Sequence, residues 1–196
     1  MLESDATPIN PARICHELTQ HVPDDGIVIV DTGHAGMWMG GMYDLRKSSQ
    51  SYIRSAGHLG WAFPAGIGAK AACPERPVVV FTGDAGFWYH IAEIETAVRW
   101  NINSITVVNN NGGGNQSKRG FDRAYGGGEE TDRRRELWTY NPMNFARIAE
   151  DMGALGIRVD KPADIAPALQ RALAANRPVV IDVVTDIEVL APTAVA

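Results

Sequence analysis

The chain has 196 residues, of which 45% are hydrophobic, and it carries a formal net charge of −5 at pH 7. This length and composition predict one globular domain over residues 1–196, with enough apolar side chains for a core. The net negative charge and the absence of a basic cluster beside aromatic residues argue against nucleic acid as a partner. No apolar stretch is long enough to span a membrane. The polar N-terminus has no signal-peptide pattern, which predicts a cytoplasmic protein.

The first expected elements are a helix and a strand. Asn10 and Pro11 form a helix start, with asparagine as the N-cap and proline in the first turn, and apolar residues follow at helical spacing. The β-branched run 27–30 is typical of a buried strand. The small and polar residues 31–34 come directly after it, where parallel sheets bind ligands, so we expect a phosphate-binding loop there.

Two segments of different character follow. Residues 35–55 mix methionines and glycines without a clear period, which predicts either irregular packing or a surface that faces a substrate. Residues 55–70, SAGHLGWAFPAGIGAK, predict a helix that is entered through a glycine turn and packs closely on its neighbours. His58 in this turn and His34 in the earlier loop are candidates for proton transfer, because histidine titrates near neutral pH.

A strand and a glycine-rich turn occupy the centre of the chain. The run 78–81 predicts a buried strand, and the turn Gly83-Asp84-Ala85-Gly86 follows it. Free backbone N–H groups at the start of the next helix, expected at 87–100, favour a diphosphate. The Asp84 carboxylate has the wrong charge to contact phosphate directly, so we expect a divalent cation between them.

A second strand completes the expected site. The run 105–108 predicts a parallel strand, which brings Asn109, Asn110 and Asn111 to the same edge of the sheet as Asp84. Carboxylate, amide, carbonyl and phosphate oxygens together form the octahedron of hard ligands that Mg²⁺ prefers. The sequence therefore predicts a magnesium diphosphate site at this edge.

The remaining chain alternates between helices and strands. The charged, glycine-rich segment 112–138 predicts a long mobile loop with room for one short helix. A helix is expected from Asn141-Pro142, a strand at 157–159, a helix at 162–175 and a last buried strand at 179–184. This alternation predicts an α/β fold with a doubly wound, mostly parallel sheet and helices on both faces.

The motifs resemble those of thiamine diphosphate enzymes, whose signature opens with GDG and closes on an asparagine pair. Residues 83–86 and the asparagine run match it, and residues 56–70 resemble the AGGLGFALPAAIG segment of benzoylformate decarboxylase and acetolactate synthase. The resemblance runs from about residue 8 to 191 and corresponds to the C-terminal, diphosphate-binding domain of that family. It implies the thiamin diphosphate-binding fold, with thiamine diphosphate and Mg²⁺ as cofactors.

The resemblance also implies the ligands of the metal ion. They are the Asp84 carboxylate, the Asn111 amide and the backbone carbonyl of Gly113. Because the asparagine run is three residues long, Asn110 remains the alternative amide ligand. Side chains one residue apart at a strand end point to opposite sides, and we expect Asn111 to contribute more to cofactor binding than Asn109.

Other cofactor contacts are implied by the same resemblance. Gly57 offers its carbonyl to the aminopyrimidine ring, and Leu59 wedges beneath the bent cofactor. Gly33 and His34 stand in a diphosphate loop, where Ala35 replaces the histidine of acetolactate synthases. The implied cofactor-binding residues are Gly33, His34, Gly57, His58, Leu59, Asp84, Ala85, Gly86, Asn111 and Gly113.

The glutamate that activates the cofactor in this family lies on a separate pyrimidine-binding domain, which this chain lacks. Glu93 and Glu95 are expected on the helix behind the metal turn, as structural carboxylates. The resemblance thus implies a subunit of a split 2-oxoacid decarboxylase or carboligase, a lyase or transferase, whose active site is completed by a pyrimidine-domain subunit or second protomer in an oligomer. The alternative is a non-catalytic cofactor-binding module, or a C-terminal fragment of a longer acetolactate synthase-like enzyme.

Overall fold

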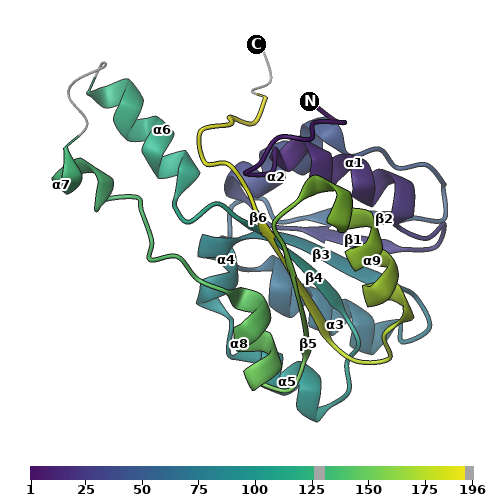
Figure 1. Cartoon of the computed structure of the whole chain (residues 1–196). Helices are drawn as coiled ribbons and strands as arrows, with labels where there is room; N and C mark the ends of the chain where they lie inside the picture. Colours follow the sequence, from purple (N-terminus) through teal and green to yellow (C-terminus); the bar gives the residue numbers. More distant parts are fainter. Residues whose placement is uncertain (126–130, 193–196) are drawn as a thin grey trace.

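The computed structural model describes residues 1–125 and 131–192 (Figure 1). Within them, helices and strands alternate along most of the chain. In chain order they are α1 (Pro11–His21), β1 (Ile27–Val30), α2 (Gly33–Met42), β2 (Ser51–Arg54), α3 (Ala62–Ala72), β3 (Val78–Gly83), α4 (Asp84–Tyr89), α5 (Glu93–Arg99), β4 (Ile105–Asn110), α6 (Asn115–Ala124), α7 (Asp132–Arg135), α8 (Phe145–Asp151), β5 (Leu155–Val159), the 3₁₀ turn η1 (Pro162–Asp164), α9 (Ile165–Ala174) and β6 (Val179–Val184).

The strands form one parallel sheet in the order β2-β1-β3-β4-β6-β5. The chain runs outward from β1 to β2 and then returns to the other side of β1 as β3. This reversal creates a topological switch point at the carboxyl ends of β1 and β3, where open α/β sheets bind ligands. The predicted α/β fold with a doubly wound parallel sheet is confirmed.

Both faces of the sheet are covered by helices, as Figure 1 shows. On β3, Val79 and Phe81 pack in the cluster that includes α1, α2 and α9, whereas Val78 and Val80 pack toward α3. Successive side chains of a strand point to opposite faces, so a strand buried on both sides must be apolar throughout. That requirement explains the unbroken β-branched runs of the central strands.

The structure corrects the prediction for residues 35–55. Instead of irregular packing, this segment holds most of α2 and the edge strand β2. Helix α2 showed no helical period because it is apolar around most of its surface. Its buried residues Trp38 and Met39 pack in the cluster that also contains side chains of α1 and β1.

The helix expected at 87–100 is broken into α4 and α5. Helix α4 packs on the ends of β3 and β4, whereas α5 packs on α3, so the chain changes direction between them. Strands β3 and β4 also run two residues further than expected, through Gly83 and Asn110. The asparagine run therefore belongs largely to the strand itself.

The structure also corrects the loop predicted at 112–138, where α6 and α7 lie; residues 126–130 of this segment are outside the described residues. Helix α6 is strongly polar and is held by Lys118, which pairs with Asp122 one turn away and with Glu188 near the C-terminus. In Figure 1, α6 and α7 project away from the sheet. Within the described ranges, no helix combines the length and apolar character that crossing a membrane requires.

Candidate functional site

A cavity of about 250 Å³ lies at the carboxyl ends of β1, β3 and β4. It is therefore at the switch point of the sheet, the place where the fold favours a ligand. Its walls come from the loop after β1, the turn after β3, the end of β4 and the start of α6. The lining residues are Thr32, Gly33, His34, Ala35, Leu59, Gly83, Asp84, Ala85, Gly86, Asn109, Asn111, Gly113, Gly114, Asn115, Gln116, Ser117 and Tyr140.

A larger hollow of about 730 Å³ lies near the amino ends of β3 and β4. Its lysine, Lys70, already donates to the backbone carbonyls of Pro74 and Arg76. Asn103 donates to Asn176 in the same region. Volume alone does not identify a site, and this hollow lies at the amino ends of the strands rather than at the switch point, so we assign the chemistry to the smaller cavity.

Asp84 is the carboxylate of the cavity and is only 4% exposed. Its Oδ1 accepts a hydrogen bond from the Ala85 N–H at 2.8 Å, and its Oδ2 accepts one from the Gly113 N–H at 3.1 Å. Burial raises the pKa of Asp84 to about 6; backbone N–H groups oppose the shift, and the charge of Asp182 adds to it. A buried carboxylate without a cationic partner among the described side chains is a group that a bound cation would stabilise.

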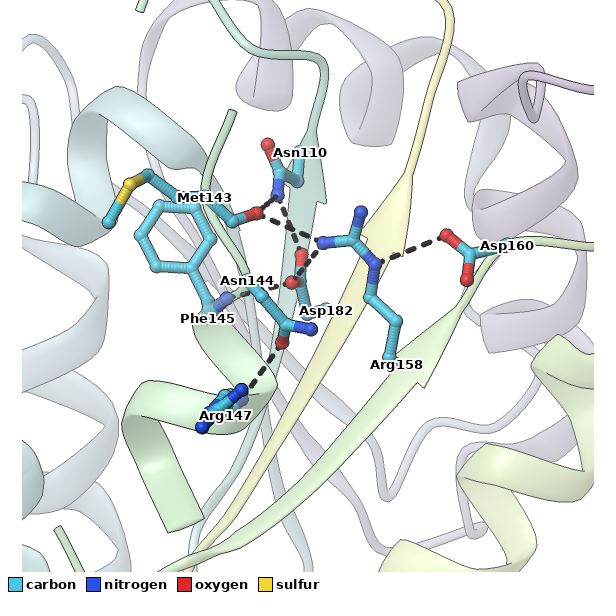
Figure 2. A network of polar contacts seen from close by, with 8 residues as sticks. All are labelled: Asn110, Met143, Asn144, Phe145, Arg147, Arg158, Asp160 and Asp182. Atoms are coloured by element: carbon cyan, nitrogen blue, oxygen red, sulfur yellow. Dashed lines mark hydrogen bonds and ion pairs between the residues drawn. The ribbon is translucent and has the colours of Figure 1, made fainter. Parts of the chain in front are cut away.

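The side chains of the three asparagines at the end of β4 point alternately to opposite faces of the sheet. Asn110 points away from the cavity, and its Nδ2 donates to Asp182 Oδ1 at 2.8 Å and to the Met143 carbonyl at 3.0 Å (Figure 2). Asn111 and Asn109 both line the cavity. Asn111 thus lies in the same cavity as Asp84, whereas the Asn110 amide is bound to partners outside the cavity. This arrangement favours Asn111 as the amide ligand of a cation.

Two glycines of the turns are required by close contacts. A Cβ atom at Gly86 would lie 2.7 Å from Asp31 Oδ2, and one at Gly113 would lie 2.6 Å from the Trp138 carbonyl. Both distances are far shorter than van der Waals contact, and both neighbours are fixed by the fold. The Gly113 carbonyl therefore belongs to a tightly packed turn that also holds the carboxylate of Asp84 through its N–H.

The loop after β1 contributes His34 to the cavity wall. His34 is buried, and neither ring nitrogen has a hydrogen-bond partner. Burial, together with the nearby positive charge of Arg119, lowers the pKa of His34, so the imidazole is neutral at neutral pH. Asn115 at the start of α6 is buried as well, and its Oδ1 lacks a partner. Buried polar atoms in a cavity wall without partners indicate that a ligand completes their hydrogen bonding.

The turn 57–60 lies at the mouth of the cavity. Leu59 lines the cavity and is 41% exposed, but Gly57 and His58 do not contribute to its walls. Ser55 Oγ accepts from the His58 N–H at 3.0 Å, and Asp31 Oδ1 accepts from the Gly60 N–H at 3.0 Å. The turn is thus anchored at both ends, with Leu59 presented between the anchors.

Sequence reasoning missed several residues of the cavity. The α6 residues were missed because the segment was expected to be a loop, whereas Asn109 was expected at this edge of the sheet but not as a cofactor contact. Neither Glu93 nor Glu95 lines the cavity, and Glu95 pairs with Arg99 on the surface of α5. Thr32, Ala35, Gly83 and Asn109 lie in or next to predicted loops but were not named as cofactor contacts, and the lining residues missed altogether are Gly114, Asn115, Gln116, Ser117 and Tyr140.

The donor set of the cavity fits a diphosphate paired with a divalent cation. Helices α2 and α6, each of ten residues, begin at the cavity, and helix N-termini favour anions. No lysine or arginine is among the described lining residues, so a cation would supply the remaining positive charge. Among the described residues no group of three His, Cys, Asp or Glu could hold a metal, so amide and carbonyl oxygens would join Asp84.

The raised pKa of Asp84 predicts a pH-dependent stability. Between the ordinary value of 3.8 and about 6, the folded chain binds more protons than the unfolded chain, so its free energy of unfolding should fall as pH rises through this window. The shift corresponds to about 3 kcal/mol at most. Thermal and urea unfolding of the wild type and Asp84→Asn between pH 4 and 7 measures it. The variant should lose this part of the slope, and identical slopes would contradict the raised pKa.

A family model described as thiamine pyrophosphate enzyme, C-terminal TPP binding domain, matches residues 31–183. The acetolactate synthase large subunit of Mycobacterium tuberculosis is 31% identical over 198 residues, which cover 97% of this chain and 34% of that protein. Glyoxylate carboligase of Escherichia coli is 33% identical over 193 residues, which cover 93% of this chain and 32% of that protein. The chain spans about a third of the length of these curated relatives.

A solved structure gives the same result. The thiamine diphosphate-dependent 4-hydroxybenzoylformate decarboxylase of Rhodococcus jostii superposes with a TM-score of 0.79 at 29% sequence identity, covering 93% of this chain and 34% of that chain. The stretch matched by the family model begins at Asp31 and ends at Val183. It therefore includes every residue that lines the cavity.

Proposed function

Because the chain belongs to the thiamine pyrophosphate enzyme family, as a C-terminal TPP-binding domain, we propose that it binds thiamine diphosphate together with Mg²⁺. We propose further that it is part of a cytoplasmic 2-oxoacid decarboxylase or carboligase. The observation that carries the proposal is the buried Asp84 carboxylate facing Asn111 and Gly113 in a cavity at the switch point of the sheet. A hard-oxygen set of this kind suits Mg²⁺ bridging to a diphosphate.

Each part of the cavity has a role in this proposal. Asp84, Asn111 and the Gly113 carbonyl would hold the metal ion, while the starts of α2 and α6 would receive the diphosphate. When bound, thiamine diphosphate supplies the carbon nucleophile that adds to the carbonyl of a 2-oxoacid. Leu59 would support the bent cofactor at the cavity mouth, and the Gly57 carbonyl would meet the aminopyrimidine.

The surface around the cavity supports a partner that completes the active site. Large apolar side chains are exposed there, which we call the apolar rim: Leu59, Tyr89 and Tyr140. Leu59 and Tyr140 line the cavity, and Gly60 packs against Tyr89, so these parts of the rim lie together. Contiguous exposed apolar groups next to a site mark an interface. We propose that a pyrimidine-domain subunit or a second protomer binds this rim and supplies the activating glutamate.

Two arrangements of the whole enzyme follow from this proposal. The pyrimidine domain belongs either to a separate subunit, as in a split enzyme, or to the same longer polypeptide, of which this chain would be the C-terminal domain. The second arrangement is supported by the length of the relatives, since the chain spans about a third of them. The non-enzymatic alternative is a cofactor-binding module without catalytic activity. In that case the chain would bind the cofactor, but no turnover would be observed in either arrangement.

The proposal predicts that activity depends on a pyrimidine domain. CO₂ release from pyruvate, sulfopyruvate and benzoylformate should be undetectable with the purified chain, since no described residue of the cavity wall supplies the glutamate. Turnover should appear when a pyrimidine-domain protein encoded beside this chain is added, and it should vanish when this chain carries Asp84→Ala. Robust turnover by the purified chain alone would contradict the shared active site.

A further inference from the structure

Asn109 lies in the wall of the cavity with its side-chain amide uncommitted. It is the next-to-last residue of β4 and is 2% exposed, and its Oδ1 has no hydrogen-bond partner. The residues before it on the same strand, Val107 and Val108, are buried in the apolar core. An apolar side chain of similar size would avoid the cost of burying an unpartnered amide at this position.

The neighbouring amides show how a structural asparagine behaves in this protein. Asn110 donates to two acceptors on the opposite side of the sheet, and Asn115 donates from its Nδ2 to the Ile187 carbonyl. Both side chains are therefore held by the protein. The Asn109 side chain makes no hydrogen bond to any described residue, so the packing of the fold does not explain why an amide stands at this position. Because its Oδ1 is enclosed, Nδ2 is the end that remains to meet a ligand.

The space beside Asn109 is open. Gly83 on β3 is its partner in the strand register, and a Cβ atom at Gly83 would have no neighbour within 4 Å. Paired residues of adjacent parallel strands project to the same face, so this space adjoins the Asn109 side chain. His34 and the start of α2 line the same cavity. The floor of the cavity thus offers room, helix N–H groups and one uncommitted amide donor.

We propose that Asn109 is a ligand of the cofactor diphosphate, whose side-chain N–H donates to a phosphate oxygen at the floor of the cavity. This inference rests on the proposed function and adds a residue to it. A phosphate suits the position better than a metal ion, because the donor end of the amide is the available one and no described lysine or arginine lines the wall. Asn109 would thereby offset part of the charge that other proteins neutralise with a basic side chain.

The test uses the purified chain and calorimetric titration with thiamine diphosphate and with inorganic pyrophosphate, each in the presence of Mg²⁺. Asn109→Leu keeps the volume and removes the donor, so both ligands should bind at least about tenfold more weakly. Asn109→Asp places a negative charge against the phosphate and should weaken binding further. Asn103→Ala, a control on the linker that precedes β4 at the other end of the sheet, should leave both affinities unchanged.

The variants separate the diphosphate role from two others. If Asn109 were a metal ligand, Asn109→Asp would preserve or strengthen Mg²⁺-dependent binding, and that result would overturn the proposal. If it were structural, Asn109→Leu would lower the melting temperature and spare the affinity. We expect the opposite, a melting temperature of the variant that is unchanged or raised by about 2–4 °C, because an unpartnered amide is removed.

A measurement on the wild type is independent of how the variants fold. The side-chain amide signal of Asn109 in a ¹⁵N–¹H NMR spectrum should shift on addition of Mg²⁺ and pyrophosphate, while that of Asn103 should not. A wild-type chain that binds neither ligand overturns the proposed function and this inference together. Wild-type binding with an unmoved Asn109 signal, or with Asn109→Leu within twofold of the wild type, overturns this inference alone.

Discussion

Replacement of Asp84 by alanine should abolish the Mg²⁺-dependent binding of thiamine diphosphate, with a loss of affinity of at least about a hundredfold. The carboxylate is the one charge that the described cavity wall offers to a cation, since the other proposed ligands, Asn111 and the Gly113 carbonyl, are neutral. Without it, the charge of the diphosphate stays uncompensated at a site that holds no described basic side chain. Calorimetric titration with and without Mg²⁺ measures the effect.

Two further variants make this result specific. Asp84→Asn keeps the shape of the side chain, but it lacks the charge, and its single amide oxygen can accept from only one of the Ala85 and Gly113 N–H groups, so it should also lose binding. Asp151→Ala removes an exposed carboxylate at the end of α8 and should bind normally. Undiminished affinity in a folded Asp84→Ala chain would refute the metal site and the cofactor role built on it.

Replacement of Asp182 by alanine should produce the largest loss of stability. Asp182 is fully buried on β6 and accepts hydrogen bonds from the Phe145 N–H and Asn110 Nδ2, both at 2.8 Å, and from the Arg158 guanidinium (Figure 2). Its removal leaves the Phe145 N–H without its acceptor and takes the buried carboxylate away from Asn110 and from the partly buried Arg158 guanidinium. A change of this kind costs about 3–5 kcal/mol, or roughly 10 °C in melting temperature for a chain of this size.

A second ion pair of Arg158 serves as the control for the Asp182 variant. The same guanidinium pairs with Asp160 at 3.1 Å, but the Asp160 side chain is 62% exposed. Solvent screens such a pair, so Asp160→Ala should change the free energy of unfolding by less than about 1 kcal/mol. Urea unfolding of both variants compares them directly, and equal losses would contradict the central place of Asp182. Because Asp182 also binds Asn110, its removal should disturb the end of β4 and weaken cofactor binding as a secondary effect.

Much of the fold follows from local sequence patterns. The strand at 179–184 matches β6 residue for residue, and the expected N-cap Asn10 accepts a hydrogen bond from the Ala12 N–H. These features depend on neighbours in sequence: a β-branched run favours an extended chain, and a capping side chain reaches only its own first turn. The position of the site at the strand ends followed from the same patterns, because parallel strands align their carboxyl ends.

Only the tertiary structure decided the features that depend on distant residues. Helix α2 has no visible period because partners from α1 and the sheet surround it, and polar α6 is tied to Glu188, about seventy residues further along the chain. The sequence did not determine which face of the sheet each asparagine side chain occupies. The structure does, because Asn110 donates hydrogen bonds to Asp182 and to the Met143 carbonyl, which are distant in sequence. Likewise, the neutral state of His34 results from burial and from Arg119, neither of which is visible in the local sequence.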